Sequence, residues 1–341
     1  MNATTNAVFG VDVAKLVFQI HSVDPETGEV TSKAIKRGKF LEYFSNRASC
    51  LVGMEACGGS QHWARRLTAM GHEVKVMAGK QVKAFVSGNK NDVADARAIW
   101  LAVQQKSIRA VAIKSEAQQA VLALHRMRSQ LVKFRTMQIN GLRGLMSEYG
   151  EVMGVGRKPL NDGMAGVLSR LAERLPNALI DTLRQQWDMV ARLDEQIVQI
   201  EQRLLAWMRE DKSSKAIGDI PGVGLLTATA AVATMGDPKT FRSGREFAAW
   251  LGLVPAQVGT GGRIRLLGIS KRGDTYLRTL LIQGARAVFY SSKEPVQWVQ
   301  ELKKRRPANV VIVALANKMA RTIWAMLAHE RAYQPNYARQ A

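Results

Sequence analysis

Short apolar segments alternate with polar turns along the first third of the chain. Segments rich in Val, Ile and Phe and bounded by turn residues predict strands, and longer segments with apolar residues on one side predict helices. The predicted strands are Val8–Val13, Leu16–Val23, Val30–Lys36, Cys50–Glu55 and Glu73–Met77, and the predicted helices are Phe40–Phe44, Ser60–Met70 and Asp92–Gln105. This order of elements predicts a mixed α/β sheet domain over residues 1–112.

Long helical patterns replace the strands over residues 113–212. Ala117–Tyr149 reads as one helix, and the Gly- and Pro-containing segment Gly150–Pro159 separates it from a second. The second helix carries apolar residues at alternating steps of three and four, which is a heptad seam: Val190, Leu193, Ile197, Ile200, Leu204 and Trp207. We therefore predict a coiled-coil hairpin that either dimerises or spaces two domains.

The first of these helices has a basic face with few acids. A row of cations on a helix suits a phosphate backbone, although a solvated basic face is an equally ordinary interpretation. The cations are Arg126, Arg128, Lys133, Arg135 and Arg143.

Residues 213–341 return to a compact, mostly helical pattern. Asp219–Gly224 followed by the apolar run Leu225–Met235 resembles a helix-hairpin-helix element. The glycines of its turn, Gly222 and Gly224, are expected to present backbone N–H groups to a phosphate. The pattern predicts further helices at Phe247–Leu251, Thr275–Tyr290 and Ala308–His329.

A basic segment rich in glycine follows the apolar turn Gly252–Pro255. It contains Gly259–Arg265 and Gly268–Gly273, and eleven Lys or Arg residues lie between Arg263 and Arg306 against three acids. Such an excess predicts phosphate binding. The expected contacts are Arg263, Arg265, Lys271 and Arg272.

Four acidic residues form a candidate metal site. Asp12 lies within the first predicted strand, Glu55 ends the fourth, and the i, i+3 pair Asp92 and Asp95 shares one helix face. A carboxylate in a buried strand is costly unless it is paired, and a divalent cation is a usual partner. Ligation by oxygen alone favours Mg²⁺ or Mn²⁺ over zinc. Each acid by itself is also explained as a cap or a solvated side chain, and Asp92 occupies an N-cap position.

The composition and net charge of the chain limit the classes of partner that it is expected to bind. The chain has 341 residues, 47% hydrophobic residues and a formal net charge of +21, so it has a globular core and a polyanionic partner, either nucleic acid or an anionic membrane. No apolar run reaches the length of a membrane span, and no signal-peptide pattern is present, so we expect a cytoplasmic protein. Cys50 and Cys57 are interpreted as reduced core residues.

Taken together, these motifs resemble a known family. The acid quartet combines with Ile220–Gly224, Gly252–Pro255, Thr260–Gly262 and Gly268–Gly273. The combination is similar to the DEDD transposases of insertion-sequence family one-hundred-and-ten, which are relatives of the Piv-type DNA invertases. The likeness covers nearly the whole chain: a RuvC-like (ribonuclease H-like) domain, a helical hairpin and a smaller transposase domain.

The resemblance implies a site-specific DNA recombinase. Members move an insertion sequence, and at least some are guided by a non-coding bridge RNA. By analogy Asp12, Glu55, Asp92 and Asp95 bind Mg²⁺, and a hydroxyl of the transposase domain forms a covalent link to DNA. The composite site is assembled within a homodimer or homotetramer, which acts at the nucleoid of a bacterial cell.

The expected nucleophile departs from the family pattern. The family has a serine directly before Gly, and Thr260 stands there in this chain. Threonine supplies the alcohol, but its β-branched carbon crowds the attack. Ser270 is the second choice, an inactive copy is a third interpretation, and either hydroxyl also suits a turn.

Two other classes of function fit parts of the pattern. A RuvC-like metal nuclease would use water as the nucleophile and produce no protein–DNA adduct. A non-catalytic DNA- or RNA-binding protein would need only the basic segments, but it leaves the strand-borne Asp12 and Glu55 unexplained.

Overall fold

The computed structural model describes residues 7–89, 91–292 and 296–335 and divides into two compact units. The first unit is Met1–Glu116 and the second is Ala117–Ala341. The predicted division into domains 1–112, 113–212 and 213–341 stays a prediction.

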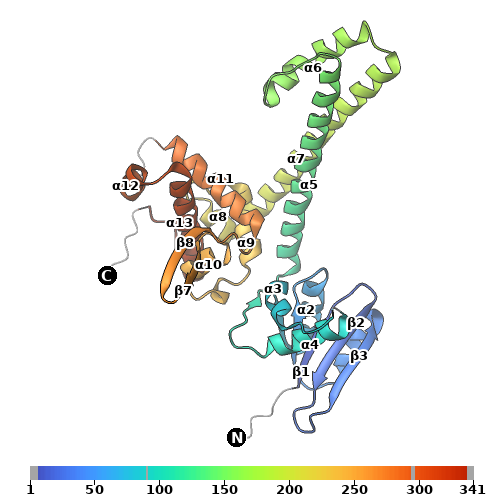
Figure 1. Cartoon of the computed structure of the whole chain (residues 1–341), viewed down its shortest axis with the longest axis vertical. Coiled ribbons are helices and arrows are strands. Elements are labelled where there is room, and N and C mark those ends of the chain that lie inside the picture. The colour runs from blue at the N-terminus through green and yellow to red at the C-terminus, as the bar shows by residue number, and fades with distance from the viewer. Residues whose placement is uncertain (1–6, 90, 293–295, 336–341) are drawn as a thin grey trace. The chain divides into compact units, whose positions relative to one another are not determined.

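The first unit is built on a six-stranded mixed sheet (Figure 1) with the strand order β3-β2-β1-β4-β5-β6. β1 pairs in parallel with β4 and antiparallel with β2, and β4 pairs in parallel with β5. The strands are β1 Val8–Asp12, β2 Val17–Val23, β3 Val30–Lys36, β4 Leu51–Glu55, β5 Glu73–Met77 and β6 Ala110–Val111. The sheet confirms the predicted α/β class and is consistent with a ribonuclease H-like domain, while the short β6 escaped the sequence analysis.

Helices cover both faces of this sheet because its strands alternate two apolar faces. One face packs against α1 Phe40–Ser45 and α2 Ser60–Ala69, and the other packs against α4 Asp92–Val103. α4 lies close to β1 because a side chain at Gly10 would meet the Ala96 carbonyl and the Trp100 backbone nitrogen. The remaining short elements are η1 Arg37–Lys39, α3 Gly79–Val82 and η2 Lys83–Phe85.

Two long helices, α5 Glu116–Glu148 and α7 Asn177–Glu210, form the predicted hairpin in the second unit. The segment between them contains a helix that the sequence analysis missed, α6 Arg157–Ala172. Pro159 lies in the first turn of α6, where its missing N–H breaks no intrahelical bond. The proline therefore lies at the start of a helix. The link predicted over Gly150–Pro159 ends before Arg157.

The heptad seam of α7 is buried within its own unit. Val190 packs with α5 and α6, and Ile200 and Leu204 pack with α5 and α9 Leu225–Met235. Leu193 and Ile197 are also buried. The seam therefore gives no independent support for a dimer.

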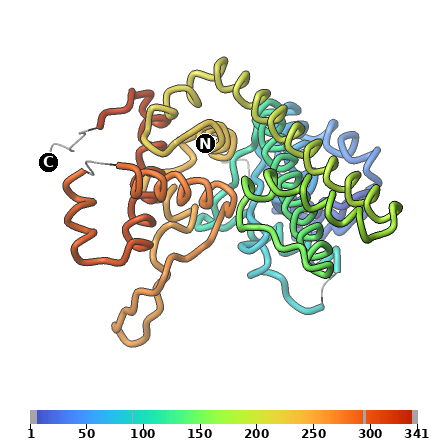
Figure 2. Tube along the Cα trace, turned by 90° about the horizontal axis from the view of Figure 1, so that it is seen from above, coloured from blue at the N-terminus to red at the C-terminus, as the bar shows by residue number. Residues whose placement is uncertain are grey.

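The rest of the second unit is a helical core with one two-stranded sheet. Its helices are α8 Lys212–Ile217, α9, η3 Pro238–Thr240, α10 Gly244–Trp250, α11 Thr275–Ser291, α12 Gln297–Arg305 and α13 Ala308–His329. The Gly-rich basic segment, for which no strands were predicted, is mainly the hairpin of β7 Pro255–Thr260 and β8 Arg263–Ile269. Gly261 and Gly262 at its turn have φ of 55° and 78°, as a type I′ turn requires. The hairpin extends away from the helices of its unit (Figure 2).

One helix, α13, is long and apolar enough to cross a membrane by length and composition. The sequence analysis expected no such segment. Val311, Ile312 and Ala316 of α13 are almost fully buried in the unit. One face of α13 therefore belongs to the hydrophobic core of its unit.

Candidate functional site

Asp12 and Glu55 end two neighbouring parallel strands. The register pairs Val11 with Met54, so the two acids occupy the next pair of positions at the same edge of the sheet. Gly10 and Gly53, which lie two residues earlier, face α4. Because side chains alternate along a strand, both carboxylates lie on the face that α4 covers.

Asp92 and Asp95 occupy the first turn of α4. Asn91, rather than Asp92, is the N-cap residue: its side chain accepts a hydrogen bond of 2.8 Å from the Ala94 backbone N–H. The capping explanation for Asp92 is therefore wrong. Asp92 is exposed and Asp95 is half-buried, on the helix that covers the Asp12 face.

The four acids match a hard divalent cation in chemistry, since all their ligand atoms are carboxylate oxygens. Among the described residues, no group of three or more His, Cys, Asp or Glu side chains is arranged to hold a metal ion. The assembled part is therefore the Asp12–Glu55 pair, and a four-ligand site stays a prediction.

Two neighbours of this pair were missed by the sequence analysis. A side chain at Gly79 would meet the Glu55 carboxylate, so the glycine leaves room for that carboxylate. Cys57 is a free, exposed cysteine, not the core residue that was expected, whereas Cys50 is buried as expected. Burial of its sulfur and the nearby carboxylates of Asp12 and Glu55 raise the pKa of the Cys57 thiol. The position of Cys57, two residues after Glu55, was the signal in the sequence that could have placed it beside the acids.

The two candidate nucleophiles differ in exposure. Thr260 is exposed as the last residue of β7 and pairs with Arg263. Val258 and Arg265 form the next pair but one, so both arginines lie on the same face of the hairpin as Thr260. The Ser270 hydroxyl oxygen is buried without a hydrogen-bond partner in the described chain. The exposed threonine is the more accessible alcohol.

The basic face of α5 is partly neutralised by the chain itself. Arg128 forms an ion pair of 2.7 Å with Glu201, and Arg135 forms one of 2.6 Å with Asp194. Arg126 and Lys133 are exposed. Of the predicted nucleic-acid contacts on this helix, these last two are the more accessible.

A buried arginine supports the basic turn after β8. Nη1 of Arg278 donates to the carbonyl oxygens of Leu251 and Arg272, at 2.9 Å and 2.8 Å. The side chain is 7% exposed. This clamp ties the segment that holds the exposed Lys271 and Arg272 to the end of α10, and no local pattern in the sequence indicated it.

The predicted helix-hairpin-helix turn joins α8 to α9. Gly222 has φ of 84° and packs so closely on α11 that an added side chain would meet the Gly284 carbonyl. Gly224 is exposed, with nothing near the position of an added side chain. Close packing on α11 is therefore a sufficient reason for a glycine at position 222. The phosphate contacts of both glycines stay predictions.

The mixed sheet with its two strand-end acids is consistent with the DEDD class of transposases. Residues 9–151 match the DEDD transposase family of the IS110 type, and residues 214–298 match the family described as transposase IS116/IS110/IS902. The chain belongs to the IS110 family of transposases.

Three relatives are similar over nearly their whole length. A probable family 20 transposase of Pseudomonas aeruginosa is 44% identical over 96% of this chain and 98% of its own. The transposase for insertion sequence element IS1111A of Coxiella burnetii is 39% identical, over 96% and 91%. The transposase for insertion sequence element IS1328 of Yersinia enterocolitica is 36% identical, over 93% and 95%.

Proposed function

We propose that this transposase moves an insertion sequence by cleaving and rejoining DNA through a covalent protein–DNA intermediate. The observation that carries the proposal is the exposed Thr260 hydroxyl on a basic hairpin in a chain that also holds the Asp12–Glu55 pair. A family of transposases requires phosphodiester cleavage, and an alcohol beside two arginines suits that reaction.

Asp12, Glu55, Asp92 and Asp95 would hold the divalent ion that DEDD transposases use, and we propose Mg²⁺, with Mn²⁺ as a substitute. Such an ion neutralises charge on the scissile phosphate and stabilises a leaving oxygen. The two strand-end carboxylates provide the fixed part of the ligand set because the sheet pairing holds them at one edge.

The nucleophile of the proposal is Oγ1 of Thr260. It bonds to phosphorus as the bond from phosphorus to the 3′ oxygen breaks; the threonine proton passes to solvent and the 3′ oxygen takes up a proton. Arg263 and Arg265 flank the hydroxyl and bind the phosphate oxygens. Attack by another 3′ hydroxyl reverses the step and releases Thr260, so rejoining needs no external energy source.

DNA is the substrate, and the family resemblance favours a bridge RNA as guide and a homodimer or homotetramer as the active assembly. Lys271, Arg272, Arg126 and Lys133 are exposed cations that suit either nucleic acid. The protein would then act at the bacterial nucleoid.

Suicide DNA substrates test the nucleophile directly. We expect wild type and Thr260→Ser to form a protein–DNA adduct in Mg²⁺, and Thr260→Val, which keeps the branched shape but lacks the alcohol, to form none. Ser270→Ala is the matched control and should retain the adduct. An adduct that persists with Thr260→Val would remove Thr260 from this role, and free 5′ phosphates without any adduct would assign the chain to the water-dependent nucleases.

A further inference from the structure

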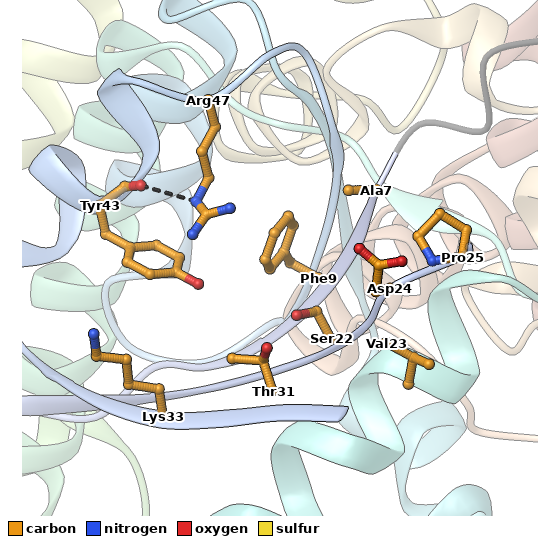
Figure 3. Close-up of a pocket in the computed structure, with 10 residues that line it drawn as sticks. All are labelled: Ala7, Phe9, Ser22, Val23, Asp24, Pro25, Thr31, Lys33, Tyr43 and Arg47. Atoms are coloured by element: carbon orange, nitrogen blue, oxygen red, sulfur yellow. Dashed lines mark hydrogen bonds between the residues drawn. The ribbon is translucent and has the colours of Figure 1, made fainter. Parts of the chain in front are cut away.

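A polar pocket of about 270 Å³ lies at the end of the sheet where β1 begins (Figure 3). It is formed by the starts of β1 and β3, the end of β2 with its following turn, and the region of α1. Its lining residues are Ala7, Phe9, Ser22, Val23, Asp24, Pro25, Thr31, Lys33, Tyr43 and Arg47.

This pocket is separate from the paired acids. Phe9 belongs to the hydrophobic cluster on the α1 and α2 side of the sheet, whereas Asp12 lies on the α4 side. Phe9 is also near the start of β1 and Asp12 is its last residue. The two places therefore differ in both face and edge, and the reaction proposed above does not use the pocket.

One wall of the pocket is a stack of aromatic rings and a guanidinium group. The Arg47 guanidinium lies 4.3 Å from the ring centre of Tyr43 and 5.4 Å from that of Phe9, and its Nε donates to the Tyr43 carbonyl oxygen at 3.1 Å. The Lys33 ammonium lies 5.9 Å from the Tyr43 ring. Neither cation has an ion-pair partner in the part of the chain that the structure describes. Flat π-faces and cations together suit an anionic ligand that has a ring.

The floor of the pocket carries groups that can read the edge of such a ring. Ser22 pairs with both Phe9 and Thr31, so the two hydroxyl side chains lie side by side on the same face (Figure 3). Asp24 accepts the N–H groups of Glu26 and Thr27 at Oδ1, at 2.9 Å and 2.8 Å. These bonds and the Thr27 hydroxyl lower the pKa of Asp24, so its carboxylate stays charged and acts as an acceptor.

We propose that this pocket binds one unpaired base of a single-stranded nucleic acid. The base stacks on the Tyr43–Arg47 wall, its edge meets Ser22, Thr31 and Asp24, and its phosphates face Lys33. Stacking on aromatic rings or Arg planes with hydrogen bonds to the base edge is the ordinary way of recognising unpaired bases. The inference rests on the proposed nucleic-acid substrate and adds to it a contact for a strand that is not in a duplex.

The volume and the charge both favour this occupant. Pockets for drug-sized ligands begin at roughly 300 Å³, so this one admits a single ring system rather than a large cofactor. The net charge of +21 favours a polyanion over a neutral metabolite. A base paired within a duplex cannot enter because its edge is occupied and its faces are stacked.

Photo-crosslinking identifies the contact. Single-stranded oligonucleotides that contain 5-iodouracil, in RNA and DNA versions of the same sequence, are irradiated with the full-length protein, and the adducts are located by mass spectrometry. We expect an adduct at Tyr43 with the strand type that occupies the pocket, and none with the matching duplex. Adducts found only outside the pocket would overturn the proposal.

Affinity measurements provide a second readout. Arg47→Ala should weaken binding of the single strand about tenfold, the usual effect of losing one stacked base, and leave duplex binding nearly unchanged. Lys36→Ala is the matched control: it removes one exposed cation of β3, outside the residues that line the pocket. Equal losses of affinity for Arg47→Ala and Lys36→Ala would show a general effect of charge. That result would refute the proposed base-binding pocket.

The two proposals fail separately. A wild-type protein that forms the Thr260 adduct but crosslinks elsewhere retains the proposed function and loses the pocket. A protein that crosslinks at Tyr43 but forms no adduct loses only the covalent chemistry.

Discussion

Gly79 leaves the space that the Glu55 carboxylate occupies, because glycine has no side chain. A Cβ at this position would meet the Glu55 carboxylate, which is the mobile end of a long side chain. Gly79→Ala should therefore displace the carboxylate at little cost in stability. We expect adduct formation to fall about tenfold or more, as for other residues that orient metal ligands, with the unfolding midpoint nearly unchanged.

Gly71→Ala serves as a stability control, because it has φ of 89° with open space around it. That variant should lose some stability through backbone strain and keep its rate of adduct formation. If Gly79→Ala were as active as wild type, Glu55 would not depend on the space beside it.

His125 gives the molecule a predictable dependence on pH. Thr229 donates its own hydroxyl to the Leu225 carbonyl at 2.7 Å, so Nε2 of His125 donates to Thr229, and Nδ1 accepts from the Tyr276 hydroxyl at 2.9 Å. Burial, and then the charge of Arg128, lowers the pKa of His125 to about 4. The folded state therefore holds the neutral imidazole.

The sign of the pH effect follows from this lowered pKa. An unfolded chain takes up the proton near pH 6.5, so the stability that His125 contributes is complete above that pH and is lost as the pH falls towards 4. The full loss is about 3 kcal/mol. We expect urea titrations to show the stability difference between wild type and His125→Gln narrowing over this window, and a constant difference would contradict the assignment.

The sequence indicated the acids of the candidate site but not what surrounds them. Asp12 and Glu55 were identified because a carboxylate at the end of an apolar run is costly and therefore conspicuous. Gly79 and Arg278 carry no such signal, since each acts through a neighbour that is distant in sequence. Asp92 and its neighbour Asn91 are both good caps, and only the fold decides between them.

At the scale of elements, the position of α4 depends on the two glycines beneath it. A Cβ at Gly10 would meet the α4 backbone at Ala96 and Trp100, whereas a Cβ at Gly53 would meet only the side chain of Val103, at 2.7 Å. Val103 is the last residue of α4, and the end of a helix shifts more easily than its middle. Gly10→Ala should therefore cost about 3 kcal/mol and Gly53→Ala about 1 kcal/mol, the two ends of the usual range for overpacking.

Urea unfolding of both variants checks this ordering. Adduct formation should fall further with Gly10→Ala as well, because moving α4 also moves Asp92 and Asp95. Equal losses of stability would mean that the middle of α4 adjusts as readily as its end.

The elements that the sequence predicted well are those in which apolar residues recur with one clear period. The strands of the first unit and the helices α5 and α7 bury a regular face, so their pattern is visible locally. α6 was missed because Pro159 was read as a break, and the β7–β8 hairpin because its glycines and arginines were interpreted only as a phosphate-binding segment. The Gly261-Gly262 pair was the usable signal for that hairpin.

At the scale of the whole molecule, the net charge of +21 predicts binding that weakens with salt. Each phosphate contact contributes about one to the slope of log K against log salt. Lys133→Ala should therefore lower the slope by about one. Arg135→Ala should leave the slope unchanged, because this arginine is already paired with Asp194.

Filter binding of duplex DNA over a salt series measures both slopes. Arg135 is a close control because it lies two residues away on the same helix and carries the same charge. Equal changes in slope for the two variants would show that nucleic acid displaces the Arg135–Asp194 ion pair.

The projecting β7–β8 hairpin has a consequence for the safety of the host chromosome. A two-stranded ribbon alone in water is only marginally stable, and here the face opposite Thr260 exposes Ile264 and Leu266 by 65% and 66%. Contacts with a bound substrate would supply the missing stabilisation, so the alcohol would be held in a reactive geometry only when the substrate is present. In the proposed reaction, a nucleophile organised by its own target would stay dormant between encounters, and this dormancy would guard the chromosome against stray nicks without any separate inhibitor.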